Sequence, residues 1–119
     1  MEVEIGDTRG HGFEKMEMLV DDSLMPTVIP ASALRRIGIV PTERRIFEYV
    51  DGKQVELGRA QAIVKLQCKE THTWVVFGDE SCNATLGKYT LGGLFLRVDS
   101  ERERLVPARG ILATPILVD

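Results

Sequence analysis

A strict alternation of apolar and mostly polar residues between positions 60 and 68 most constrains the fold of this chain. The apolar positions are Ala60, Ala62, Val64, Leu66 and Cys68. A period of two places these side chains on one face of a strand, whereas a helix would distribute them around its axis. We therefore expect a long, half-buried β-strand here.

Turn chemistry predicts a hairpin just before that strand. Asp51-Gly52 lies between β-rich flanks at 45–50 and 53–57, and both residues of the dipeptide tolerate positive φ. Gly58 is interpreted as a bulge after the second flank. Further strands are predicted at residues 1–5, 16–20, 27–29, 74–77, 94–98 and 104–106.

Two short helical segments are expected among the strands. One starts at Pro30 and ends before Gly38, a residue that suits a C-terminal cap. The other is a helical turn at 88–91, which ends at a Gly92-Gly93 break. Together the elements predict a mostly β chain, a small closed or partly closed β-barrel with one or two short helices.

Composition sets the class of protein. A chain of 119 residues with 44% hydrophobic content suits a single domain spanning residues 1–119. Its net charge of −3 provides no general attraction for nucleic acid. The apolar runs are far shorter than the roughly 20 residues that span a bilayer, and no apolar leader is present. A soluble, cytoplasmic protein without nucleic-acid or membrane partners is therefore expected.

The sequence predicts no metal or cofactor site. Cys68 and Cys82 lack a metal-binding spacing and are expected to be reduced thiols. His11 and His72 have no carboxylate or cysteine at ligand spacing. No phosphate-binding glycine loop is found. Trp74 opens an apolar run and is expected in the core rather than on a ligand-binding surface.

The segment with the most chemical content is 19–30, which reads LVDDSLMPTVIP. An apolar strand runs straight into Asp21, and a short loop then leads to a second apolar run. This order places a carboxylate at the end of a strand, close to the core. On the residues alone, an aspartate with a purely structural role in a turn is an open alternative.

The same segment resembles the active-site loop of the retropepsin family of aspartic proteases (clan AA). That family has two apolar residues, a catalytic Asp, Thr or Ser, Gly and Ala, and after a few residues Thr or Ser with two apolar residues. Asp21 falls on the catalytic aspartate, and Thr27 falls on the later Thr or Ser. Leu86-Gly87, followed by a helical turn, matches the family's second conserved segment.

The resemblance covers roughly residues 1 to 107 and implies the fold and the assembly of that family. It places the flap, a mobile hairpin that closes over substrate, at Val50, Asp51, Gly52 and Lys53. It also implies a homodimer that acts on peptide or protein substrates. The apolar tail at 109–119 is a candidate dimerisation strand, and an edge strand packed on its own domain is the alternative.

Aspartic proteolysis requires two carboxylates that share one proton. Asp21 and Asp22 are adjacent, so their side chains diverge in an extended backbone, and the second carboxylate must come from a second chain. Asp22 replaces the family's Thr or Ser and cannot donate a hydrogen bond when ionised. Ser23 replaces its Gly, and the Ser23 hydroxyl is expected to support Asp21.

Three functions follow from these residues. The first is an aspartic endopeptidase that acts as a homodimer with one Asp21 per chain, and the changes at Asp22 and Ser23 predict weak activity. The second is an inactive relative that keeps the fold as a dimerisation or peptide-binding module. The third is a small β-barrel binding domain unrelated to proteases, in which Asp21 belongs to an ordinary turn.

Overall fold

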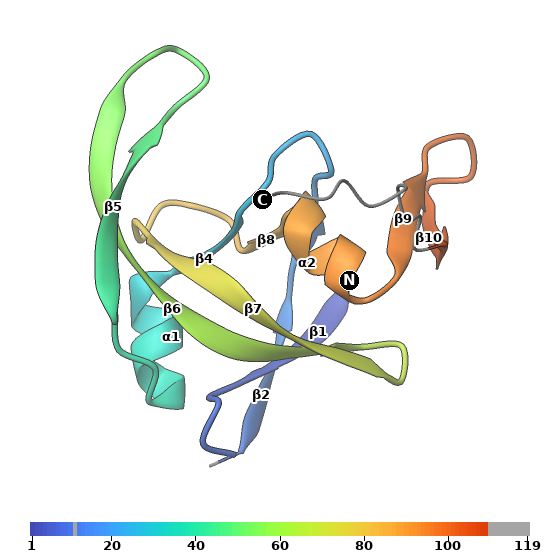
Figure 1. Ribbon diagram of the computed structural model, residues 1–119, viewed down its shortest axis with the longest axis horizontal. Helices are drawn as coiled ribbons and strands as arrows, with labels where there is room; N and C mark the ends of the chain where they lie inside the picture. The colour runs from blue at the N-terminus through green and yellow to red at the C-terminus, as the bar shows by residue number, and fades with distance from the viewer. Residues whose placement is uncertain (11, 110–119) are drawn as a thin grey trace, which may run out of the picture.

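The computed structural model describes residues 1–10 and 12–109 and shows a mostly β protein (Figure 1). Eight strands form one curled sheet in the order β2-β1-β6-β7-β4-β8-β3, and β5 pairs with β6. The strands of this sheet are β1 Glu2–Gly6, β2 Phe13–Glu17, β3 Leu19–Val20, β4 Thr27–Pro30, β5 Glu43–Glu48, β6 Gln54–Leu66, β7 Lys69–Gly78 and β8 Thr85–Leu86. A separate hairpin contains β9 Leu96–Asp99 and β10 Arg104–Pro107.

The mostly β fold and the two short helices confirm the expectation from the sequence. The sheet remains open, because β2 and β3 lie at its two ends and each pairs on one side only. The molecule is therefore a curled half-barrel rather than a closed barrel. No helix among the described residues is long and apolar enough to cross a membrane. The predicted tail strand at 109–119 falls almost entirely outside the described residues, as does His11.

The long alternating strand forms as predicted, but its limits differ at both ends. β6 is one continuous strand of 13 residues, so Gly58 does not divide it. A Cβ at Gly58 would lie 2.8 Å from the Cβ of Pro41, so the glycine permits a close approach of the two chain segments. At the other end, Gln67 and Cys68 adopt φ values of 53° and 63° and form the turn into β7. Cys68 is therefore an exposed turn residue rather than the last residue of the strand.

The core lies on one face of the curled sheet. Alternate residues of β6 and β7 meet there, and Leu34 from the first helix is fully buried against them. Each fully buried aliphatic side chain of this kind contributes roughly 1.5–3 kcal/mol. The largest fully buried apolar side chains are Val3, Ile5, Ile29, Leu34, Val64, Val75, Leu86 and Leu91.

Helix α1 (Ala31–Ile37) confirms the prediction of a helix after Pro30. Gly38 ends it with φ of 93°, the left-handed conformation that glycine adopts without strain. Helix α2 (Lys88–Gly93) is longer than expected, because Gly92 and Gly93 belong to it and do not break it. A Cβ at Gly93 would lie 2.6 Å from the Thr71 hydroxyl, which explains glycine in this helix.

The β5–β6 hairpin curls away from the rest of the sheet, at the left of Figure 1. Its tip is a five-residue loop, 49–53, rather than the two-residue turn that Asp51-Gly52 predicted. The N–H of Tyr49 donates to the Lys53 carbonyl oxygen (2.8 Å), and the N–H of Lys53 donates to Asp51 Oδ1 (3.0 Å). Val50 is 98% exposed at this tip, so the hairpin ends in an unpartnered apolar side chain within the described residues.

Candidate functional site

The loop at 21–26 crosses the end of another strand, because β8 lies between β3 and β4. β3 and β4 are consecutive in the sequence, so the connection between them must pass over β8. The N–H of Asp21 donates to the Leu86 carbonyl oxygen (3.0 Å) at the start of the loop. Asp21 therefore lies at the end of a strand that is hydrogen-bonded to its neighbour.

The other end of the loop contacts α2. The N–H of Lys88 donates to the carbonyl oxygen of Leu24 (2.8 Å), and that of Tyr89 donates to the carbonyl oxygen of Met25 (3.2 Å). The first N–H groups of a helix have no acceptor within the helix. Here the carbonyl oxygens of the loop are their acceptors. The loop and the helix consequently fix each other's positions.

Gly87 lies directly beneath this crossing. A Cβ at position 87 would overlap the carbonyl group of Pro26, so only glycine fits under the loop. The N–H of Gly87 donates to Thr27 Oγ1 (2.9 Å). The structure thus brings together Asp21, Thr27 and Leu86-Gly87, the positions that the sequence had singled out in two distant segments.

A buried chain of hydroxyl groups extends from Thr27 into the molecule. Thr27 Oγ1 lies 2.6 Å from Thr90 Oγ1, which lies 3.1 Å from Thr73 Oγ1. Thr27 and Thr90 are 1% and 0% exposed, so their hydroxyls depend on partners within the protein for hydrogen bonds. The sequence analysis missed Thr73 and Thr90, since no local pattern indicates that a helix and two strands meet there.

The carboxylate of Asp21 accepts two hydrogen bonds from Ser23. The N–H lies 2.9 Å and the hydroxyl 2.5 Å from the same Oδ1 atom. The Ser23 hydroxyl and then the Ser23 N–H hold the pKa of Asp21 below its ordinary 3.8, because both favour the ionised form. Within residues 1–10 and 12–109 no cation pairs with Asp21. Its second oxygen is therefore available to a group from outside the described chain.

Asp79 and Ser81 repeat this local geometry in the loop between β7 and β8. The Ser81 N–H and hydroxyl lie 2.6 and 2.5 Å from Asp79 Oδ1, and they lower the pKa of Asp79 in the same way. Both loops read Asp, an acidic residue and Ser. The bonds from Ser23 to Asp21 therefore arise from local sequence, and what distinguishes Asp21 is its position at the crossing over β8.

The neighbours of Asp21 are exposed. Asp22 and Ser23 face solvent, and Leu24 and Met25 are 43% and 46% exposed despite their apolar side chains. The predicted loop residues therefore form a continuous surface with two carboxylates and two large apolar groups. Such a surface is suited to a contact with another chain or with a ligand.

A pocket of approximately 480 Å³ opens beside this loop. Met25 and Pro26 form one wall, and Tyr89 from α2 adjoins them. The opposite walls come from the half-barrel sheet, and their residues are Phe47, Arg59, Trp74 and Val76. The volume falls in the range of about 300–1,000 Å³ that is typical of ligand pockets.

Trp74 corrects a prediction from the sequence. It was expected in the core but is 37% exposed, on the face of β7 opposite to buried Val75. The guanidinium of Arg59 stacks over its ring at 4.0 Å from the centroid. Periodicity failed here because residues 75–77 are all buried, so the run does not reveal which face carries the core.

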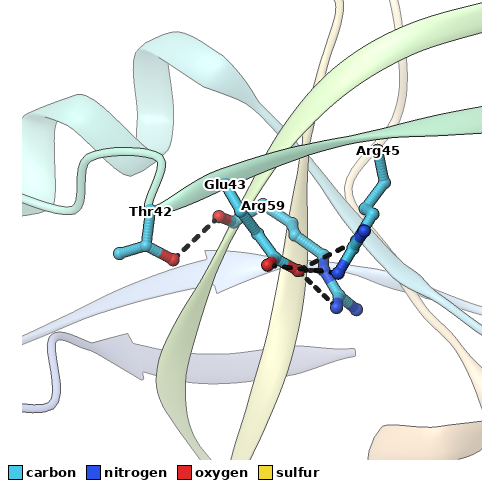
Figure 2. A network of polar contacts seen from close by, with 4 residues as sticks. All are labelled: Thr42, Glu43, Arg45 and Arg59. Carbon is cyan, nitrogen blue, oxygen red and sulfur yellow. Dashed lines mark hydrogen bonds and ion pairs between the residues drawn. The ribbon is translucent and has the colours of Figure 1, made fainter.

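Arg59 belongs to a polar network at the base of the β5–β6 hairpin (Figure 2). Its Nε donates to Glu43 Oε1 at 2.6 Å, and the same oxygen accepts from Arg45 Nε at 3.2 Å. The hydrogen bond from Arg59 is the main cause that lowers the pKa of Glu43, and the charge of Arg45 acts in the same direction. The Thr42 hydroxyl also donates to the Arg59 carbonyl oxygen (3.3 Å), so the backbone of Arg59 is held as well.

Metal ligation and thiol chemistry are two further possibilities for the described residues. No group of three or more His, Cys, Asp or Glu residues within the described ranges is arranged to hold a metal ion. Burial, together with the charges of Asp79 and Glu80, raises the pKa of the Cys82 thiol, so this cysteine is a poor nucleophile. No protein-family model matches the chain, and no curated protein matches it.

Proposed function

We propose that the chain is a homodimeric aspartic peptide hydrolase of retropepsin type, with weak activity. The observation that carries this proposal is the position of Asp21. An ionised carboxylate, with no cation beside it in the described chain, lies at a strand end fixed by β8. It begins a loop that is held by α2 and whose later residues, Met25 and Pro26, line a pocket.

The chemistry requires a second carboxylate from another copy of the chain. Two carboxylates about 3 Å apart cannot both ionise, so they share one proton. The ionised Asp21 takes a proton from water as the water oxygen bonds to the peptide carbonyl carbon, and the partner subunit's Asp21 gives its proton to the carbonyl oxygen. The resulting diol collapses, the C–N bond breaks, and the amine leaves with a proton from the dyad.

The residues next to Asp21 account for weak activity. Asp22 puts a carboxyl group where the family has a hydroxyl, and a carboxylate accepts hydrogen bonds but donates none. Ser23 stabilises the ionised form of Asp21, which opposes the protonation that one member of the dyad needs. The hydrogen bonds from Ser23 reduce the population of the singly protonated pair near neutral pH, whereas repulsion between the two Asp22 carboxylates weakens the association of the two chains.

A second candidate is a catalytically inactive module that binds peptides or dimerises. The repeated geometry at Asp79 and Ser81 favours it, since the same hydrogen bonds form in a second loop that the proposal gives no catalytic role. On this account the chain keeps the fold but lacks a working catalytic triplet at 21–23, and the exposed loop and pocket serve binding alone. Substituting Asp22→Thr together with Ser23→Gly should then create activity.

Cleavage of denatured casein between about pH 4 and 7 tests the proposal. We expect slow cleavage by the unaltered protein and none by Asp21→Asn, because the dyad would lose its ionisable groups. Asp79→Asn is the matched control, since it alters the equivalent loop away from the site, and it should cleave casein at the unaltered rate. Cleavage that survives Asp21→Asn would refute the catalytic role.

A further inference from the structure

We propose that the pocket between the loop at 21–26 and the half-barrel sheet binds a peptide segment in which a large apolar side chain is followed by a carboxylate. This inference names the class of peptide for the proposed function, and it rests on that function only for cleavage of the bound segment. Binding itself requires only the pocket and its charged side chains. Both belong to a single chain, so binding does not depend on the dimer.

The sheet face that lines the pocket is apolar although it lies opposite to the core. Residues directly opposite on paired strands share a face, and the register pairs Phe47 with Val55 and Arg59 with Val76. The core side chains of β6 occupy the alternate positions. A sheet with apolar side chains on both faces has a second surface that remains to be covered. Partly exposed Phe47 and Trp74 supply that surface here, next to buried Val76.

Exposed aromatic and sulfur-containing side chains complete the pocket. Tyr89 is 69% and Met25 is 46% exposed at its rim, beside the partly exposed ring of Trp74. Aromatic anchors and methionine are enriched where proteins bind peptides and other partners. A large aliphatic or aromatic side chain would therefore remove apolar surface from water on both sides of the contact.

On the sheet side of the pocket, away from Asp21 and Asp22 on the loop, the charges favour an acidic group next to that side chain. Two guanidinium groups, those of Arg45 and Arg59, share one carboxylate, that of Glu43. The network (Figure 2) thus carries one uncompensated positive charge. Arg59 pairs closely with Glu43 and lies against Trp74 at the pocket wall. Arg45 lies two residues before Phe47 on the same face of β5, so the excess charge lies beside the pocket. A ligand carboxylate would restore the balance and accept charge-assisted hydrogen bonds.

Trp74 provides a direct measurement, because it is the single tryptophan of the chain. The test titrates the Asp21→Asn protein with three acetylated and amidated hexapeptides that differ in one residue after a central phenylalanine: Asp, Asn or Lys. We expect the Asp peptide to shift Trp74 emission at a concentration about tenfold lower than the Asn peptide, as hydrogen bonds to charged groups imply. The Lys peptide should bind more weakly than both.

Variants locate the two parts of the site. Arg45→Met should remove the preference for Asp over Asn. Arg59→Met should do the same, because methionine keeps an apolar side chain against Trp74 but lacks the positive charge. Tyr89→Ser should weaken all three peptides by a similar factor. Ile46→Ala is the matched control, because Ile46 lies on the other face of β5, is 68% exposed and does not line the pocket. It should leave every titration unchanged.

Three results would overturn the proposal. They are equal affinity for the Asp and Asn peptides, no change of emission with any peptide, and a shift of emission with protein concentration alone, which would mean that a second copy fills the pocket. The titration uses a variant that cannot form the catalytic dyad. A failure to cleave casein would therefore count against the proposed catalysis, whereas a failure to bind the peptides would count against the proposed binding site.

Discussion

At the scale of single residues, Ser23 sets the ionisation of Asp21. Its hydroxyl and N–H lower the pKa of Asp21 below 3.8. We expect Ser23→Ala to raise that pKa toward its ordinary value, because only the N–H donor would remain, and an NMR titration of the carboxyl group of Asp21 measures it. A group whose pKa is lowered in the folded state stabilises the fold above its unfolded pKa and loses this contribution as pH falls through the folded value.

The stability of the Ser23→Ala variant has a matching pH dependence. Its free energy of unfolding should fall below that of the unaltered protein at pH 6. The two free energies should converge as the pH falls through the folded pKa of Asp21 in both proteins. Ser81→Ala is the matched control, since it should raise the pKa of Asp79 and leave that of Asp21 unchanged. An Asp21 titration that is the same in the Ser23→Ala variant would contradict the assigned cause.

At the scale of elements, the crossing of the loop at 21–26 over β8 depends on Gly87. Gly87→Ala would place a methyl group against the Pro26 carbonyl, where no flexible side chain can move aside. We expect the free energy of unfolding to fall by about 2–4 kcal/mol, in the range of strongly destabilising steric changes. Denaturation by urea measures this loss.

Gly92→Ala is the matched control for that substitution. Gly92 lies in α2, and nothing lies within 4 Å of a Cβ built there. Alanine in a helix is favoured over glycine by roughly 0.5–1 kcal/mol, so this variant should be as stable as the unaltered protein or more stable. A Gly87→Ala protein of unchanged stability would show that the loop moves freely away from β8.

At the scale of the whole molecule, the proposed dimer should be weak because of Asp22. In that proposed dimer, Asp22→Thr would replace a carboxylate by a hydroxyl that can donate across the twofold axis. Each such hydrogen bond contributes about 0.5–1.5 kcal/mol, so two of them should lower the dimer Kd about tenfold or more. Analytical ultracentrifugation over a range of protein concentrations measures the change.

Asp22→Val separates the two effects of this substitution. Valine has the shape of threonine but donates no hydrogen bond, so the Kd of this variant should lie between those of the unaltered protein and Asp22→Thr. The difference between valine and aspartate then reports the repulsion between carboxylates. Monomers of all three proteins at every concentration would contradict the dimer and the shared dyad.

The sequence by itself determined the local elements of this protein. Alternation from Ala60 to Leu66 predicted the central strand, and it forms because a period of two buries one face of an extended chain. The helix after Pro30 and its end at Gly38 also follow from local backbone preferences. Asp21 was placed correctly at the end of a strand for the same reason, since its position depends on a short apolar run.

Only the tertiary structure decided which elements meet. The insertion of β8 between β3 and β4, the hydroxyl chain through Thr90 and the exposed face of Trp74 have no local signature. The sheet's open edges and the positive φ of Gln67 were likewise settled by strand pairing. The physical reason is that a side-chain period specifies a face of a strand, whereas the neighbour that covers this face is chosen by contacts between residues far apart in the chain.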